Sequence, residues 1–431
     1  MPKKNKLLVF CLDALCTRDI EYMKSLPAFG EILNRGSYVK HVEPTYPTLT
    51  YPCHTTIITG NYPDKHGIIH NEKVTVGKIN SPWYTQKDDV KCPTLLDVAR
   101  DKGYTTCSIS WPVSGGADYT YNMPMIVPYG YVGPNPGQFF QNNATQNLLD
   151  TYYWKYGRLL KGKSRNLDNY TMALAPDIIR DFGQPDIMLI KMCDLDSVRH
   201  AYGVSNEQVR EQLRKHDYEF SVILESIKRY GDYKNTNFVI LGDHGQSDVD
   251  HVLHFNVALR DAGFIRVDQE NQIIDYDAYC HSAALSAWVE LKNPEDKEMY
   301  DKVYKFLLGC KDNPKYGIGY VFTKQEVQEQ FHLSIPFDFV IEGDKPISFG
   351  NRLDCDLYGK TELGDYKTSR ASHGGLPFKD ETTTFIAAGP SIKEGIVVER
   401  RSMIDEAPTM AKMLGFEMPN VDGKIIGEIL K

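Results

Sequence analysis

Short apolar runs rich in β-branched residues alternate along the chain with longer segments whose apolar residues recur at helical spacing. The apolar runs predict buried strands, and the spaced segments predict amphipathic helices. The predicted strands are 6–12 (KLLVFCL), 104–110 (YTTCSIS), 187–192 (IMLIKM), 237–241 (NFVIL) and 383–388 (TTFIAA). The predicted helices are 21–36, 94–103, 206–231 and 403–415. This alternation favours an α/β fold with a mostly parallel central sheet and helices on both faces.

Two regions depart from this alternation. Residues 115–170 are rich in Tyr, Asn, Gly and Pro and predict loops, while residues 265–365 contain less regular segments. We find no internal repeat and no low-complexity linker. We therefore predict a single domain over residues 1–431, with an inserted small cap at about 265–365.

Composition narrows the classes of function. The chain has 431 residues, of which 42% are hydrophobic and 25% charged, and its net charge is −8. These values are ordinary for a globular protein, and the absence of a basic stripe argues against nucleic-acid binding. No apolar run reaches the length of about 18 residues that a membrane span needs. Nine cysteines without regular spacing predict reduced thiols and a cytoplasmic location.

Residues that bind metal ions follow several of the predicted strands. Asp13 follows the first strand, Asp194 and Asp196 follow 187–192, and the pair Asp243 and His244 follows 237–241. In an open α/β sheet, ligands bind beyond the carboxyl ends of the strands. These side chains are therefore expected to form one site.

The spacing within these segments supports metal binding. Asp196 and His200 are four residues apart, which places them on one face of a helix, and His373 lies beside a pair of glycines. Taken singly, each segment also fits a helix cap, a surface histidine or a polar turn. Together they mix carboxylate oxygen with imidazole nitrogen, which suits Zn²⁺ first and Mn²⁺ or Fe²⁺ next. There are enough ligands for two divalent ions.

The segment TLTYPCHTTIITG, residues 48–60, places Thr50 ahead of a predicted helix. Thr50 is followed by Tyr51 and Pro52, and proline is favoured in the first helical turn, so Thr50 is a natural N-cap. A helix N-terminus also attracts anions. A threonine hydroxyl placed there and touching a metal ion is a candidate nucleophile.

These motifs together resemble those of the alkaline phosphatase superfamily. Five separated blocks agree with it in order and residue type: Asp13, TLTYPCHTTIITGNYPDKHGI, DLDSVRHAYG, GDHG, and SHGG followed by TTFIAAGP. Within the superfamily, the sequence is most similar to the nucleotide pyrophosphatase/phosphodiesterase family. The resemblance covers nearly the whole chain except the region near 265–365, and it implies the parallel-sheet fold of that superfamily.

The resemblance also implies roles for particular residues. Thr50 matches the nucleophile, which forms a covalent phosphothreonine intermediate. Two groups match the ligands of two zinc ions, with Mn²⁺ as the alternative metal. The first group is Asp196, His200 and His373, and the second is Asp13, Thr50, Asp243 and His244. The implied reaction is hydrolysis of phosphodiester or pyrophosphate bonds in a small-molecule phosphate ester, with nucleotides among the expected substrates.

Two positions depart from the family pattern. The resemblance leads us to expect an asparagine donor three residues after the nucleophile, where this chain has Cys53. Arg199 stands where the family often has a small residue, one residue before His200. We include Cys53 and Arg199 as candidate substrate-binding residues, although an arginine at such a position more often faces solvent or pairs with an acid.

Several alternatives remain open at this stage. Within the superfamily, the chain could be a phosphomonoesterase or a phosphonate hydrolase. From other classes, a phosphomutase and a non-catalytic metal-binding protein are alternatives. The Tyr-rich segments 81–86 and 118–133 could line a groove for the second substituent of a diester, so we expect diesters to be preferred over monoesters. The oligomeric state is left open.

Overall fold

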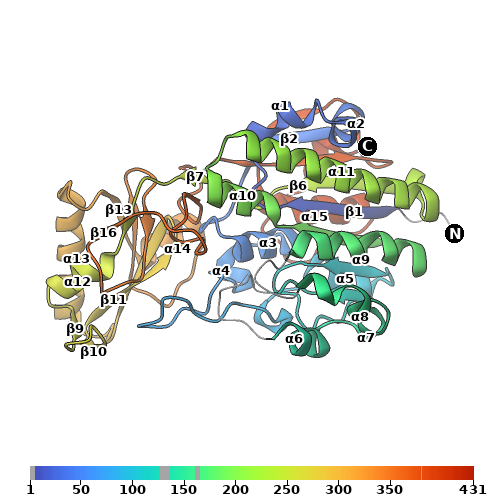
Figure 1. Ribbon diagram of the computed structural model, residues 1–431. Helices are drawn as coiled ribbons and strands as arrows, with labels where there is room; N and C mark the ends of the chain where they lie inside the picture. Colours follow the sequence, from blue (N-terminus) through green and yellow to red (C-terminus); the bar gives the residue numbers. More distant parts are fainter. Residues whose placement is uncertain (1–4, 127–134, 161–165, 380) are drawn as a thin grey trace.

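An eight-stranded sheet forms the larger lobe of the protein (Figure 1). The computed structural model describes residues 5–126, 135–160, 166–379 and 381–431. The strand order is β19-β2-β18-β6-β1-β5-β3-β4, and within it only β18 runs antiparallel to its neighbours. The bounds are β1 Lys6–Leu12, β2 Ser37–Glu43, β3 Thr106–Ile109, β4 Tyr121–Met123, β5 Ile187–Met192, β6 Thr236–Leu241, β18 Thr383–Ala388 and β19 Val397–Ser402. The predicted fold class is confirmed.

The three central strands explain why the apolar runs of the sequence are nearly continuous. β1 lies between β5 and β6, with Leu8 opposite Met188 on one side and Phe238 on the other. Both faces of these strands are covered, so alternate side chains enter two different cores. Leu8 and Phe10 pack in one core, whereas Leu7 and Val9 pack in the other.

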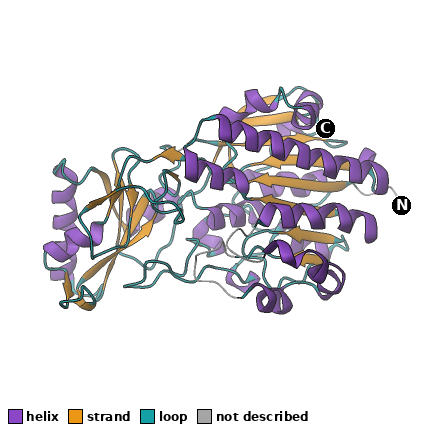
Figure 2. Ribbon diagram, in the orientation of Figure 1, coloured by secondary structure: helices purple, strands orange, loops and turns teal. Residues whose placement is uncertain are grey.

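Helices cover both faces of the sheet, as Figure 2 shows. One face packs against α2 (Pro27–Arg35), α9 (Leu167–Asp181) and α11 (Glu207–Tyr230). The other face packs against α3 (Thr50–Thr59), α5 (Leu95–Asp101) and α15 (Glu406–Met413). Three of the four predicted helices appear as single α-helices, although α15 is preceded by a 3₁₀ turn. The fourth, predicted over 21–36, is divided into α1 (Ile20–Met23) and α2 because Pro27 begins a new helix.

The smaller lobe, residues 255–343, lies at the left of Figure 1. It contains an antiparallel sheet of order β11-β12-β14-β13, a two-stranded ribbon of β9 and β10, and its own apolar core. The elements are α12 Phe255–Asp261, β9 Ile265–Val267, β10 Ile273–Tyr276, β11 Ala278–Ala283, β12 Ser286–Leu291, α13 Lys297–Asp312, β13 Ile318–Thr323, α14 Lys324–Phe331 and β14 Phe339–Gly343. The cap boundaries at about 265–365 stay a prediction.

The remaining elements are short; some connect the two lobes, and the others belong to the larger lobe. The helix α10 (Asp194–Tyr202) directly follows β5 and is central to the site described below. The other elements are α4 Pro63–His66, α6 Pro136–Asn143, α7 Gln146–Leu148, α8 Trp154–Tyr156, β7 Ser247–Asp248, β8 Val252–Leu253, β15 Ser348–Phe349, β16 Tyr358–Gly359 and β17 Ala371–Ser372. No helix in the described part of the chain has the length and apolarity to span a membrane. All nine cysteines are free thiols, as their spacing predicts.

The central strands should dominate the stability of the larger lobe. Ile240 in β6 is fully buried, so Ile240→Ala should lower the free energy of unfolding by about 2–5 kcal/mol through lost burial and a residual cavity. Ile274 in β10 is 67% exposed, and Ile274→Ala should change it by less than about 0.5 kcal/mol. Denaturant unfolding of both variants measures the difference, and equal losses would contradict this view of the core.

Candidate active site

The carboxyl ends of β1, β5 and β6 meet at one edge of the sheet, and the candidate residues follow them directly. Asp13 immediately follows the last residue of β1. After β5, Cys193 is followed by Asp194, the first residue of α10, and after β6 a single glycine precedes Asp243. Because the three strands are parallel, these segments leave the sheet side by side. Thr50, at the start of α3, lies at the same edge.

The first group of predicted ligands is brought together by the structure. The ligand atoms of Asp196, His200 and His373 all lie within 4.8 Å of one another. Asp196 Oδ1 is 3.2 Å from His200 Nε2, one helical turn along α10, and 3.7 Å from His373 Nε2. Each histidine is held by its other nitrogen: Nδ1 of His200 donates to the Ala371 carbonyl at 2.6 Å, and Nδ1 of His373 to the Thr48 carbonyl at 2.9 Å. Both Nε2 atoms are thereby directed into the cluster as acceptors.

The second group surrounds His244. Its Nε2 lies 3.3 Å from Asp13 Oδ1, 3.2 Å from Asp243 Oδ2 and 3.2 Å from Thr50 Oγ1. Asp243 is oriented by the backbone N–H of Ala14, which donates to Oδ1 at 2.9 Å. Asp196 joins Asp13 and His244 in a second set of mutually close ligand atoms, so the two groups are contiguous. The rings of His244 and His373 stack with centroids 3.7 Å apart.

Buried polar atoms at this cluster fit a metal ion. Within the described part of the chain, Asp13 Oδ1, Asp243 Oδ2 and His200 Nε2 are buried and make no hydrogen bond. A buried acceptor without a donor is costly, and one that faces other acceptors needs a cation. The mixture of carboxylate and imidazole donors suits Zn²⁺ or Mn²⁺. Thus the residues present fit the metals that the sequence motifs imply.

The electrostatics of the cluster agree with this. Burial, together with the nearby His244, holds the pKa of His373 well below its usual value, so its ring is neutral at pH 7 and offers a lone pair. Burial alone would raise the pKa of Asp196, but the adjacent His200 holds it below its usual range. Burial and the charge of Asp243 raise the pKa of Asp13 well above its usual value. A cation bound between Asp13 and Asp243 would remove that repulsion.

The side chain of Thr50 is directed at the cluster by the way α3 begins. We expected Thr50 to be the N-cap, but the structure makes Leu49 the N-cap and Thr50 the first helical residue. No side-chain cap hydrogen bond is made at this end of the helix. The Thr50 hydroxyl is therefore not used as a cap and contacts His244 instead.

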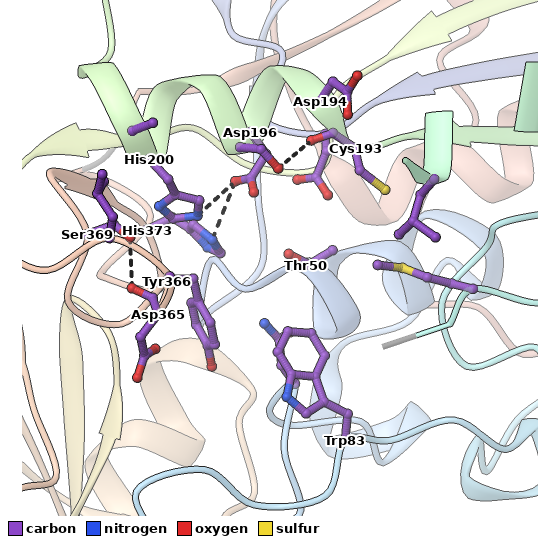
Figure 3. A pocket seen from close by; sticks show the side chains of 18 of the residues that line it. Thr50, Trp83, Cys193, Asp194, Asp196, His200, Asp365, Tyr366, Ser369 and His373 are labelled. Atoms are coloured by element: carbon purple, nitrogen blue, oxygen red, sulfur yellow. Dashed lines mark hydrogen bonds and ion pairs between the residues drawn. The ribbon is translucent and has the colours of Figure 1, made fainter. Parts of the chain in front are cut away.

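A cavity of about 330 Å³ opens onto this cluster. In Figure 3, Asp196, His200 and His373 point toward one another, and the Tyr366 ring stacks beside His373 with ring centroids 5.8 Å apart. Trp83 lies farther from the three ligands and lines the same cavity. The wall also contains apolar and polar side chains that sequence patterns did not place there: Asn71, Leu167 and Lys191. Of the Tyr-rich segments expected to line a groove, 81–86 contributes Trp83 and 118–133 contributes Met125. Residues 127–133 of the second segment lie outside the described residues.

Cys53 does not line this cavity. Its side chain is buried in the core beneath α3, with Sγ 3.8 Å from Thr45 Oγ1 and 4.0 Å from the Pro47 carbonyl. The reason is helical geometry, because the side chain three residues after Thr50 points toward the sheet rather than past the helix end. A role for Cys53 in binding substrate is therefore not supported.

Asn71 occupies the place expected for a donor. It lines the cavity beside the start of α3, and its Oδ1 accepts a hydrogen bond from Tyr51 N at 2.9 Å. This bond directs the carboxamide at the helix end and leaves the two N–H groups of Nδ2 as donors. No local sequence signal marks Asn71, since it lies 20 residues from its partner in an irregular segment.

Arg199 also lies away from the cavity, with a fully buried side chain. Its Nη2 donates to both carboxylate oxygens of Asp19, at 2.7 and 2.8 Å, and its Nη1 donates to the Ala14 carbonyl. The contact with substrate considered for Arg199 is thus contradicted. Arg199 instead fixes the loop that follows Asp13, and so helps to position this carboxylate.

The sequence model of the family described as type I phosphodiesterase/nucleotide pyrophosphatase matches residues 7–375. This match takes in Thr50, the candidate nucleophile, and every predicted metal ligand. The chain belongs to the type I phosphodiesterase/nucleotide pyrophosphatase family. Membership confirms the resemblance drawn from the motifs and identifies the protein as a hydrolase of phosphoric esters.

Relatives of this phosphodiesterase family extend over most of the chain. Human ectonucleotide pyrophosphatase/phosphodiesterase family member 7 is 24% identical over 437 residues, covering 98% of this chain and 82% of its own. Human family member 1 is 26% identical over 277 residues, which cover 60% of this chain and 26% of that protein. The solved structure of murine ectonucleotide pyrophosphatase/phosphodiesterase 5 superposes with a TM-score of 0.69 at 17% identity, covering 99% of this chain and all of that one. Another structure of that murine protein is an inactive form in complex with AMP.

Removing one imidazole from the cluster should weaken metal binding. We expect His373→Ala to lower the affinity for Zn²⁺ by at least about 100-fold, because a direct ligand should matter more than the supporting residues around it. His332→Ala, at an exposed histidine, is the matched control and should leave affinity unchanged. Competition titration against a chromophoric chelator measures both, and an unchanged affinity in His373→Ala would exclude this metal site.

Arg199→Met tests the structural role of that side chain. It leaves Asp19 buried and unpaired, so the free energy of unfolding should fall by about 3–5 kcal/mol. The double variant Arg199→Met/Asp19→Leu should recover much of this loss, because neither charge is then stranded. Denaturant unfolding checks the stability. If Arg199→Met instead changes the ratio of activities on diesters and monoesters without loss of stability, Arg199 contacts substrate.

Proposed function

We propose that this protein hydrolyses phosphodiester or pyrophosphate bonds in small-molecule phosphate esters, including nucleotides, with Thr50 as a covalent nucleophile and two divalent cations. The observation that carries the proposal is the position of the Thr50 hydroxyl. It lies at the start of α3, in contact with His244, and on the wall of a cavity that the ligands also line. A hydroxyl in this position serves no capping role, whereas a nucleophile needs this access.

The two groups of ligands give each cation its place. Asp196, His200 and His373 would hold one ion, and Asp13, Thr50, Asp243 and His244 would hold the other. Two such ions supply Lewis acidity for the attacking and leaving oxygens of an in-line displacement. Zn²⁺ fits this donor set best and Mn²⁺ next.

The residues of the chain perform the reaction in two steps. Thr50 gives up its hydroxyl proton to solvent as its Oγ bonds to phosphorus, the bond from phosphorus to the leaving oxygen breaks, and the leaving oxygen takes up a proton from solvent, so that a phosphothreonine results. Water then attacks the same phosphorus, and the bond to Thr50 Oγ breaks. Asn71 Nδ2, held at the helix end by the Tyr51 N–H, donates to a phosphoryl oxygen in both steps.

The cavity wall favours a substrate with an organic substituent on the far side of the phosphoryl group. Trp83, Met125 and Leu167 provide aromatic and apolar surface there, and Tyr366 adds an aromatic ring beside His373. A second substituent distinguishes a diester from a monoester, so this surface supports the diesterase assignment over a phosphomonoesterase or phosphonate hydrolase. The cytoplasmic location stays a prediction.

Thr50→Ala tests the nucleophile. We expect kcat to fall by at least about 10³-fold with the fold and the cavity intact. Thr59→Ala, at the other end of α3, is the matched control, because Thr59 is buried and donates to the Thr55 carbonyl outside the site. Turnover of an aryl nucleotide diester by Zn²⁺-loaded protein gives the rates, and elemental analysis should find close to two ions per chain.

Acid quenching during turnover supplies a second measurement. A phosphorylated peptide containing residue 50 is expected by mass spectrometry in the wild type and not in Thr50→Ala. If Thr50→Ala keeps most of its activity, or the phosphoryl group is found on another residue, Thr50 is not the nucleophile.

A further inference from the structure

Lys191 is a buried cation on the wall of the cavity. It lies in β5, where the neighbouring positions of IMLIKM are apolar, and its side chain is only 1% exposed. A lysine is almost never fully buried without a partner. Its Nζ lies 2.5 Å from Asp13 Oδ2, the carboxylate that also contacts His244.

One carboxylate oxygen does not satisfy this ammonium group. In the described part of the chain, its other hydrogen-bond partners are two sulfur atoms, Met125 Sδ at 3.6 Å and Cys193 Sγ at 3.3 Å. Sulfur is a weak acceptor, and an ammonium group has three donors. All three partners of Lys191 line the same cavity. Two N–H groups of Lys191 are thus available to a stronger acceptor that enters it.

A cation bound by Asp13 increases this availability. Asp13 belongs to the proposed ligand set, and its charge would then be shared between Lys191 and the bound ion. Lys191 would be left beside a positive ion, in a buried site, with less negative charge to balance its own. An anionic oxygen of the substrate restores that balance.

We propose that Lys191 binds a second negative charge on the substrate and makes the site prefer phosphoryl groups that carry one. The inference rests on the proposed function and names the class of substrate within it. Within the proposed function, the second charge belongs to a neighbouring phosphate, as in a pyrophosphate bond. The other source of such a charge is the reacting phosphoryl group of a monoester, and the experiment distinguishes the two. A simple diester carries only one charge and gains least from Lys191.

Lys191→Met removes the charge and keeps an unbranched side chain of similar length. Rates are measured on three substrates: bis(4-nitrophenyl) phosphate, 4-nitrophenyl phosphate and a dinucleoside pyrophosphate. Relative to the wild type, kcat/KM for the aryl diester should change least. For at least one of the other two substrates, kcat/KM should fall about 10- to 100-fold more than it does for the aryl diester. The substrate that shows this larger fall identifies the source of the second charge.

Matched variants separate contact with substrate from support of Asp13. Lys191→Arg keeps the charge and should preserve the substrate preference. Lys191→Gln should behave like Lys191→Met, and it serves as the uncharged variant if Lys191→Met does not fold. Lys6→Met is the control, because Lys6 and Asp186 form a 2.7 Å ion pair at the opposite ends of the same two strands. Zn²⁺ content is measured for every variant by elemental analysis.

The inference is overturned if kcat/KM falls by the same factor on all three substrates in Lys191→Met or Lys191→Gln, whether or not the variant also loses Zn²⁺. Lys191 would then only position Asp13. This outcome is distinct from failure of the proposed function, in which the wild type loaded with Zn²⁺ or Mn²⁺ hydrolyses none of the three. If the wild type is active and Lys191→Met keeps the same order of preference among the three substrates, the inference about Lys191 is overturned and the proposed function is not.

Discussion

Three carboxylates, those of Asp13, Asp196 and Asp243, converge at one edge of the sheet, and two of them are fully enclosed by protein. Enclosed negative charge is costly unless cations are present. The structure supplies part of the balance through Lys191 and the imidazoles, and the atoms without hydrogen bonds show that the balance is incomplete. The need for bound cations therefore connects the fold of the larger lobe to its chemistry.

The candidate metal ligands are held by residues that do not themselves belong to the ligand groups. Backbone carbonyls of Thr48 and Ala371 each fix one histidine, and Arg199 fixes the loop after Asp13. Such bonds reduce the freedom of each ligand before any ion or substrate arrives. Precision at the site thus depends on segments that contain no catalytic residue.

The sequence predicted the sheet, most of the helices, and the convergence of Thr50 with the two candidate ligand groups, because these follow from local patterns. Apolar runs mark buried strands, and acids or histidines directly after them mark the active edge. Of the surroundings of that edge, it predicted only the segments that contribute Trp83 and Met125. Asn71 and Lys191 are placed by partners distant in the chain, and the direction of the Cys53 side chain depends on where α3 begins. Arg199 resembles a surface cation by sequence, and only the loop opposite it explains its burial.

The order of the ligands along the chain has a consequence for biosynthesis. Asp13 lies near the amino end, whereas His373 arrives only after the chain has passed through the smaller lobe and returned. A nascent chain that has not yet reached residue 373 lacks one ligand and the segment that covers the cluster. Contacts between such distant residues form late in folding, because a long loop must first be closed. Hydrolytic activity therefore cannot arise before residue 373 has been translated, and its appearance signals that the chain beyond the smaller lobe has returned to the site.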